Sequence, residues 1–190
     1  MKHDIVTLGA SAGGVEALQA VVRSIPATID AAFFVVMHLS AWSRSELPRI
    51  LSNAGPLPAM HARDDEPIEQ GRIYVAPPDY HLVLEDSRTV LWRGPKENRS
   101  RPSINVLFRS AAVAYRERVT GVVLSGALDD GSAGLWWIRR YGGAAIVQDP
   151  AEAIVPDMPR SALEHVDTAR IARLSEIGLL VSRLAAGKEV

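Results

Sequence analysis

The chain has 190 residues, of which 47% are hydrophobic and 23% are charged, and its formal net charge is −1. This length and composition suit a single α/β domain over residues 1–190 with a sizeable core. The near-neutral charge without long runs of one sign argues against a general nucleic-acid surface or a polybasic anchor, and the absence of cysteine excludes disulfides and thiol nucleophiles.

The start of the chain bears on where the protein works. The first apolar run is only a few residues long before it reaches glycine, so it matches neither a signal peptide nor a membrane span. We therefore expect a cytoplasmic protein without an integral membrane segment.

The first quarter of the sequence alternates strand and helix signals. Residues 5–8 form an apolar run closed by glycine, and apolar residues at helical spacing follow from Gly13 until proline interrupts them. Residues 32–37 are continuously β-branched or aromatic, which indicates a strand covered on both faces. A helix is predicted over residues 46–53.

That helix has its own start and stop signals. Ser43, Ser45 or both can cap it, Pro48 is tolerable in its first turn, and Gly55 ends it. Short strands are then predicted over residues 59–62, 73–76, 81–84 and 90–92, of which the last two form a hairpin.

The second half returns to alternation. Ser103 is the expected cap of a helix over residues 104–118, which presents one apolar stripe to a sheet. Further elements are predicted in the order strand 119–124, helix 132–141, strand 144–148, helix 158–165, extended segment 168–171 and helix 173–186. This alternation predicts a mostly parallel sheet flanked by helices, a fold in which reactive groups gather beyond the carboxyl ends of the strands.

The turn Gly9-Ala-Ser11-Ala-Gly13 has the pattern G-x-S-x-G between a strand and a helix. In this context a sharp turn exposes the serine oxygen at the helix N-terminus, where unpaired amides can stabilise a developing oxyanion. A glycine-rich turn that only packs or binds phosphate has about equal weight from the motif alone. Ser11 is therefore a candidate nucleophile that needs a base.

His38 follows the predicted strand 32–37 and is the candidate base, although a lone histidine there is more often structural. Asp130 lies past the end of strand 119–124 and supplies the carboxylate that a serine triad uses to orient its imidazole. Asp129 competes with Asp130 and is the less favoured of the two. Three reactive groups at three strand ends favour a serine hydrolase.

The remaining histidines have simpler interpretations. His3 lies near the terminus and His165 in a late helix, and both are read as structural. His61 and His81 are reserve candidates that either face the substrate or support the fold.

Several segments resemble the catalytic domain of the chemotaxis protein-glutamate methylesterases. They span nearly the whole chain in order: Gly9-Ala-Ser-Ala-Gly-Gly-Val-Glu-Ala, Val36-Met-His38, Val75-Ala-Pro-Pro-Asp-Tyr-His81, Gly94-Pro-Lys-Glu-Asn-Arg-Ser-Arg-Pro-Ser-Ile-Asn-Val-Leu-Phe108, Gly126 to Gly134, Gln148-Asp-Pro and Met158-Pro-Arg.

The resemblance implies a doubly wound parallel sheet with a hairpin insertion, and a triad in which Ser11 is the nucleophile, His38 the base and then acid, and Asp130 the orienting carboxylate. It implies hydrolysis of glutamate methyl esters on a methylated chemoreceptor-like signalling protein, with glutamine deamidation as a second candidate activity and no metal or organic cofactor. Backbone amides near Ala12 and Ala127 would form the oxyanion hole, and Arg99 and Arg101 would meet the receptor.

The sequence also departs from that family. No receiver domain precedes the catalytic residues, so phosphorylation control within this chain is not expected, and a separate regulatory protein is the alternative. Ala12 stands where threonine is frequent, and Met37-His38-Leu39-Ser40 replaces the usual Gln-His-Met-Pro context. Substrate contacts or rate can differ from those of the family for this reason.

Two other functions remain open at this point. A dinucleotide-dependent reductase would explain the glycine-rich turn, but its glycine spacing is imperfect and no acidic ribose-binding residue ends the second strand. A non-catalytic receptor-binding module of the same fold is the stronger alternative, because a fold does not establish chemistry.

Overall fold

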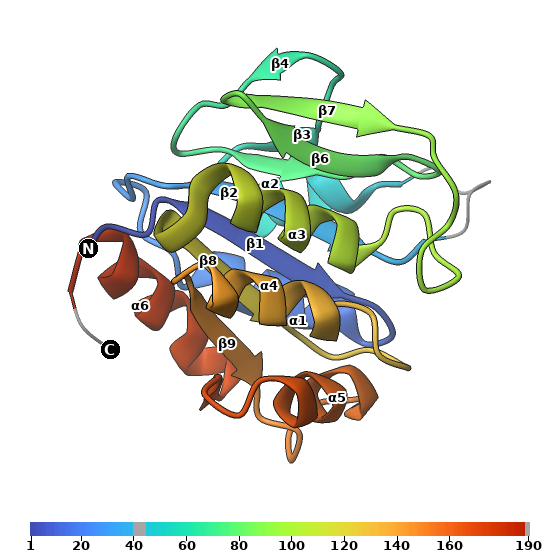
Figure 1. Cartoon of the computed structure of the whole chain (residues 1–190). Coiled ribbons are helices and arrows are strands. Elements are labelled where there is room, and N and C mark those ends of the chain that lie inside the picture. Colours follow the sequence, from blue (N-terminus) through green and yellow to red (C-terminus); the bar gives the residue numbers. More distant parts are fainter. Residues whose placement is uncertain (40–44, 189–190) are drawn as a thin grey trace.

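The computed structural model describes residues 1–39 and 45–188 and contains a central parallel sheet (Figure 1). Its seven strands lie in the order β10-β9-β8-β1-β2-β5-β3, and all neighbouring pairs are parallel. They are β1 (Ile5–Ala10), β2 (Ala32–Met37), β3 (Ala59–His61), β5 (Ile73–Val75), β8 (Val119–Val123), β9 (Ala144–Gln148) and β10 (Arg170–Ala172). The predicted α/β class is confirmed.

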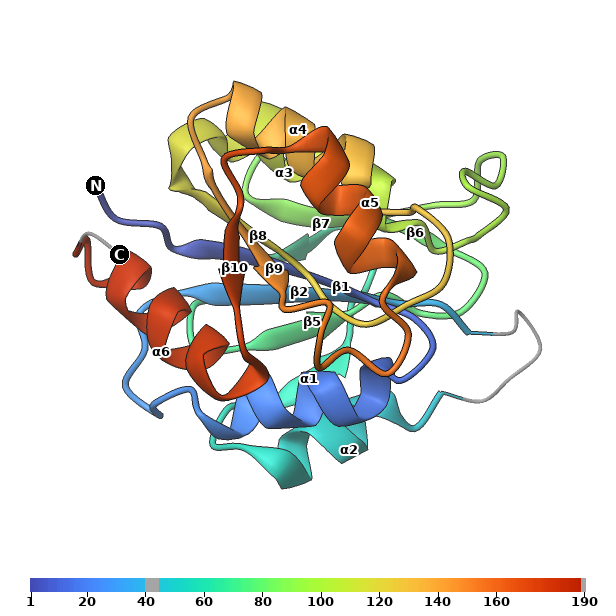
Figure 2. The ribbon, with the colours of Figure 1, turned by 90° about the horizontal axis from the view of Figure 1, so that it is seen from below.

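Helices cover both faces of this sheet (Figure 2). On one face lie α1 (Gly14–Arg23), α2 (Leu47–Ala54) and α6 (Leu174–Ala185), and on the other lie α3 (Ile104–Tyr115), α4 (Ser132–Arg140) and α5 (Asp157–His165). Each face has its own apolar core, as expected for central strands that are buried on both sides. No helix among the described residues is long and apolar enough to span a bilayer.

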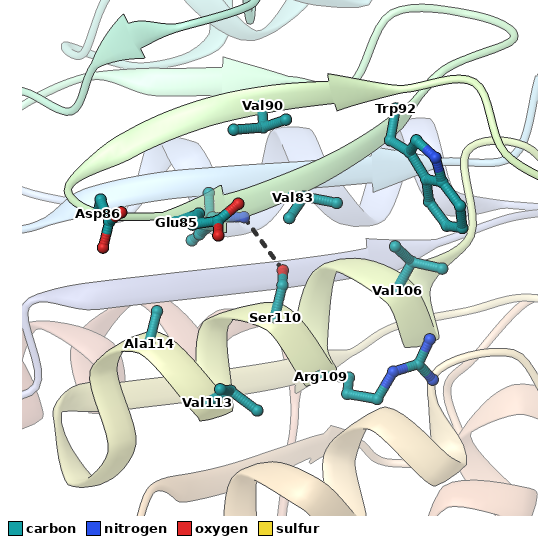
Figure 3. Close-up of a pocket in the computed structure, with 11 residues that line it drawn as sticks. Val83, Glu85, Asp86, Val90, Trp92, Val106, Arg109, Ser110, Val113 and Ala114 are labelled. Carbon is teal, nitrogen blue, oxygen red and sulfur yellow. Dashed lines mark hydrogen bonds between the residues drawn. The ribbon is translucent and has the colours of Figure 1, made fainter.

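A smaller antiparallel sheet lies beside α3. It contains β4 (Glu66–Pro67), β7 (Arg88–Trp92) and β6 (His81–Glu85), in that spatial order. The hairpin predicted from the sequence is confirmed as the β6–β7 pair. The hairpin and α3 line an open apolar pocket, among whose lining residues the Ser110 hydroxyl accepts a hydrogen bond from the Leu84 amide at 3.1 Å (Figure 3).

Most element boundaries agree with the predictions within two residues. β1 extends to Ala10, and the helix predicted to reach residue 118 is α3 followed by a 3-10 turn, Arg116–Arg118. Glu46, not a serine, directly precedes α2, although the Ser45 hydroxyl accepts a long bond of 3.4 Å from the Leu47 amide. The alternative cap, Ser43, lies outside the described residues.

The order of the strands creates a topological switch point beside β1. From β1 the chain winds outward to β2, β3 and β5, and it then crosses back to β8 on the other side of β1 before reaching β9 and β10. Ligands of doubly wound sheets bind at the carboxyl ends of the strands where the order reverses. Here those ends belong to β1, β2 and β8.

Candidate active site

Ser11 occupies the tight turn between β1 and α1. Its amide donates to the Ser125 carbonyl at 3.0 Å, and its own carbonyl accepts from the Gly14 amide at 2.8 Å. Gly13 has a φ of 73°, which glycine adopts without strain. The turn therefore leaves the serine side chain at the carboxyl end of the sheet, beside the strand end of β8.

The loop after β8 comes close to the Ser11 turn at Gly126. A Cβ atom on this residue would lie 2.8 Å from the Ser11 Cβ and 2.1 Å from the Met158 sulfur. Only glycine fits between Ser11 and α5. The loop after β8 can consequently reach over Ser11.

His38 bridges Ser11 and Asp130. Its Nδ1 lies 3.2 Å from the Ser11 Oγ, and its Nε2 lies 2.7 Å from the Asp130 Oδ2. If Nε2 carries the proton and donates to the carboxylate, Nδ1 has a free lone pair that can accept the serine proton. The three side chains form the nucleophile, base and orienting-group arrangement of serine hydrolases.

The Asp130 carboxylate is buried, with 1% of the residue exposed, and is saturated with donors. Besides His38, it accepts hydrogen bonds from the Ser103 hydroxyl at 2.9 Å and from the amides of Ile104 and Asn105 at 2.7 and 3.0 Å. The two amides are unpaired donors at the start of α3, where the helix dipole favours a negative charge. Asp130 is thus held in one orientation.

These contacts correct the prediction for Ser103. It holds the position before α3, but its side chain makes no capping bond to the helix and donates to Asp130 instead. A carboxylate accepts from two amides at once and carries a charge, so it is the stronger cap where both groups compete. The cap of α3 therefore comes from residue 130 and not from the adjacent sequence.

Asn105 completes a reciprocal arrangement that the sequence did not indicate. Its Oδ1 accepts hydrogen bonds from the amides of Gly131 and Gly134 at 3.0 and 2.7 Å, which are at the start of α4. A residue near the start of α3 thus caps α4, and Asp130, just before α4, caps α3. A sequence pattern identifies a capping residue only for the helix that directly follows it. It therefore gives no signal for caps that two helices exchange.

The structure separates Asp129 from Asp130. Asp129 is exposed, and its Oδ1 accepts a hydrogen bond of 3.1 Å from the Asn98 side chain. Of these two carboxylates, only Asp130 contacts His38 among the described residues. Asn98 also accepts a bond from the Asn105 side chain at 3.2 Å, so the loop before α3 is tied to the same corner of the molecule.

The reserve histidines have structural partners. The buried His81 accepts from the Ser103 amide at Nδ1, at 3.2 Å, and its Nε2 lies 2.9 Å from the Pro95 carbonyl. Both ring nitrogens of His61 lie near backbone carbonyls, those of Val75 and Ser45. Neither ring contacts Ser11 in the described part of the chain.

Ala12 and Ala127 were the expected oxyanion donors. Within residues 1–39 and 45–188, neither amide donates a hydrogen bond to another protein group. Ala12 is exposed and Ala127 is half-buried, on the two loops that meet at Ser11. Their role in binding an oxyanion stays a prediction.

The two predicted receptor-binding arginines differ in surroundings. Arg99 is exposed and has a φ of 64° in the turn after Asn98. Arg101 is half-buried and donates to the Asp79 carboxylate at 2.6 and 3.0 Å and to the Gly94 carbonyl at 2.6 Å. Hydrogen bonds from Arg101, supplemented by Arg93, hold the pKa of Asp79 below its ordinary value. A receptor contact by Arg101 stays a prediction and must coexist with this ion pair.

Other features of the surface do not join this site. The pocket of Figure 3 is lined by the hairpin and α3 and includes no member of the Ser11, His38 and Asp130 group. No cluster of three acidic or histidine side chains in the described residues is suited to hold a metal ion.

The comparison with protein families gives one match over nearly the whole chain. The model described as CheB methylesterase matches residues 6–181. A protein of Leptospira interrogans is 38% identical over 185 residues, which cover 97% of this chain and 96% of that protein; its name assigns it protein-glutamate methylesterase and protein-glutamine glutaminase activities provisionally.

Longer relatives carry the same two activities in their names. The protein of Trichodesmium erythraeum is 36% identical over 84% of this chain and 46% of its own length, and that of Maricaulis maris is 32% identical over 98% of this chain and 47% of its own length. This chain therefore spans about half of each of them. A crystal structure of the Thermotoga maritima CheB methylesterase catalytic domain matches with a TM-score of 0.91 at 27% identity, covering 97% of this chain and all of that one.

Proposed function

Because the chain belongs to the CheB methylesterase family, we propose that it removes methyl esters from glutamate side chains of a chemoreceptor-like signalling protein, with Ser11, His38 and Asp130 as its catalytic triad. One observation carries the site assignment. It is the hydrogen-bonded sequence Ser11 Oγ, His38 Nδ1, His38 Nε2 and Asp130 Oδ2, with separations of 3.2 and 2.7 Å.

In the first half of the reaction, His38 Nδ1 takes the hydroxyl proton while Ser11 Oγ attacks the γ-carbonyl carbon of the methylated glutamate. The tetrahedral intermediate carries a negative oxygen, for which the amides of Ala12 and Ala127 are the proposed donors. The intermediate collapses and the C–O bond to the methoxy group breaks. His38 returns its proton to that group, and methanol leaves.

In the second half, water attacks the acyl group on Ser11 and His38 accepts the proton of the water. Collapse of the second intermediate gives a free glutamate carboxylate and returns the proton to Ser11. Asp130 holds the Nε2–H tautomer and stabilises the imidazolium that forms in both halves. With a glutamine side chain the same steps release ammonia, which makes deamidation the second proposed activity.

The wider assignment includes the substrate and the setting of the enzyme. We propose residues 1–190 as one catalytic domain, since a single sheet carries both apolar cores. Arg99 and Arg101 are proposed to contact the receptor, near the loop that Asn98 ties to Asp129. A cytoplasmic location and a separate regulatory protein belong to the same proposal and are supported by family membership alone.

The deciding measurement is methanol release from methylated receptor fragments by wild type and by Ser11→Ala. Removal of the nucleophile is expected to lower kcat by about 10⁴-fold or more, while circular dichroism and thermal unfolding stay unchanged. Ser182→Ala on α6, away from the carboxyl ends of β1, β2 and β8, serves as the control. Serine-independent release would refute the mechanism, and a folded wild type without any release would favour the receptor-binding module.

A further inference from the structure

Two large apolar side chains are exposed beside the nucleophile. Leu128 is 58% exposed and Ile154 is 67% exposed, although most residues of their size in this protein are buried. Isolated exposed apolar residues are common and need no explanation. These two differ because the loops that carry them contact the turn that holds Ser11 or the strand end beside it.

Ile154 lies over the turn that follows the nucleophile. A Cβ atom on Gly13, two residues after Ser11, would be 2.7 Å from the Ile154 Cβ. Leu128 comes two residues after Gly126, whose own Cβ position would be 2.8 Å from the Ser11 Cβ. The two residues therefore belong to the two loops that contact the Ser11 turn, Ile154 to the loop before α5 and Leu128 to the loop after β8.

The loop that carries Ile154 is firmly attached to the active-site turn. The Ser125 hydroxyl donates to the Ala12 carbonyl at 2.8 Å and accepts from the Val155 amide at 2.9 Å. The Gly126 amide donates to the Val155 carbonyl at 3.0 Å. The exposure of Ile154 consequently belongs to an ordered loop with satisfied backbone groups.

Leu128 has an additional peculiarity in its backbone. Its φ is 67°, in the left-handed region that is unfavourable for a residue with a Cβ atom. Glycine would remove this cost, and burial does not compensate for it because the side chain points largely into solvent. Neither backbone preference nor core packing therefore accounts for a leucine at this exposed position, in a loop that contacts the Ser11 turn.

We propose that Leu128 and Ile154 form an apolar clamp that binds apolar side chains next to the target glutamate of the protein substrate. The inference rests on the proposed function, which fixes the occupant. A glutamate side chain is short, so a substrate whose γ-carbonyl reaches Ser11 must bring its backbone and neighbouring residues against both loops. Apolar neighbours would gain burial there, whereas charged neighbours would lose hydration without a partner.

The first test measures binding without turnover. In a Ser11→Ala background, Leu128→Gly and Ile154→Ser are each expected to weaken binding of a methylated receptor fragment about tenfold, as loss of one partly buried aliphatic contact implies. Leu179→Ser, which removes a 62% exposed leucine from α6, is the matched control. Affinities equal to that of the control variant would overturn the clamp.

The second test compares two substrates in the active enzyme. For Leu128→Gly and Ile154→Ser, kcat/KM for the receptor fragment is expected to fall about tenfold more than kcat/KM for a small glutamate γ-methyl ester, which has no neighbouring residues. Equal losses on both would overturn the proposal, because the residues would then act on the reacting centre. If wild type releases no methanol while the variants still weaken binding, the esterase assignment fails and the clamp stands.

Discussion

At the scale of single residues, the Asp130 carboxylate combines a proposed catalytic role with a structural one. It orients His38 and also accepts the first amides of α3. In Asp130→Asn, one acceptor oxygen becomes an NH₂ group that must face existing donors. We expect kcat to fall about 10³–10⁴-fold and stability to drop by about 1–3 kcal/mol, as measured by methanol release and denaturant unfolding.

Asp129→Asn is the matched control for that change. Its side chain keeps an acceptor oxygen for Asn98 and has no contact with His38 in the described structure. Activity within about twofold of wild type is expected for an exposed substitution of this kind. A severe loss in Asp129→Asn together with an active Asp130→Asn would reverse the assignment of the carboxylates.

Asn105 positions the loop that carries Asp130, through its bonds to the amides of Gly131 and Gly134. Asn105→Leu removes both acceptor contacts, and we expect a stability loss of about 1–2 kcal/mol and a lower kcat with little change in KM. Asn105→Asp retains the acceptor oxygen but loses the donor to Asn98 and adds a buried charge near Asp130, so it should restore only part of both. A kcat that is unaffected in the leucine variant would contradict the positioning role.

These residues also show how far the sequence could identify the site. Ser11, His38 and Asp130 could be nominated because each follows a predicted parallel strand, and such strand ends meet at one edge. The structure brings those three side chains together. Ser103 was assigned the wrong partner and Asn105 was missed, because their contacts depend on how α3 and α4 are docked.

At the scale of elements, the hairpin is attached to α3 through one edge-strand amide. Leu84 is buried and donates to the Ser110 hydroxyl, which also donates to the Leu107 carbonyl at 2.9 Å (Figure 3). Ser110→Ala leaves this amide unpaired and should lower the free energy of unfolding by about 1–2 kcal/mol, measured by urea denaturation. Ser110→Thr keeps the hydroxyl and should lose less; equal losses would contradict the role of the bond.

The loop before α3 has a pH-dependent attachment to the segment before β6. Because Arg101 lowers the pKa of Asp79 from its ordinary value of 3.8, the carboxylate stabilises the fold fully above that pH, and the contribution is lost as the pH falls through the lower, folded-state pKa. The stability difference between wild type and Asp79→Asn should therefore be constant near neutrality and shrink below pH 3.8. Urea denaturation at a series of pH values measures it, and a constant difference would contradict the linkage.

Element prediction succeeded where hydrophobic periodicity is strong and continuous. β2 and β9 have the predicted boundaries because β2 is apolar throughout and β9 is apolar up to its last residue, Gln148. β4 was missed since it has only two residues, one of them Pro67, and is defined by pairing with β7 rather than by its own sequence. The helix predicted over residues 104–118 ends in a 3-10 turn, Arg116–Arg118. Its hydrophobic periodicity did not indicate this change of helix type.

At the scale of the whole molecule, the order of strands in space could not be read from their order in the chain. Alternating strands and helices predicted the class, which is confirmed. β5 nevertheless lies between β2 and β3, and β8 lies beside β1 across more than a hundred residues. The placement of β1 between β2 and β8 is what gathers the three reactive groups, and it depends on packing of both sheet faces.

The exchanged caps of α3 and α4 have a consequence for the order of events in folding. The carboxylate of Asp130 is oriented only when α3 has docked, and the start of α4 is secured only when Asn105 is in place. Under the proposed mechanism, hydrolysis therefore requires both helices to be docked. We expect ester hydrolysis to appear during refolding together with this docking and not before it.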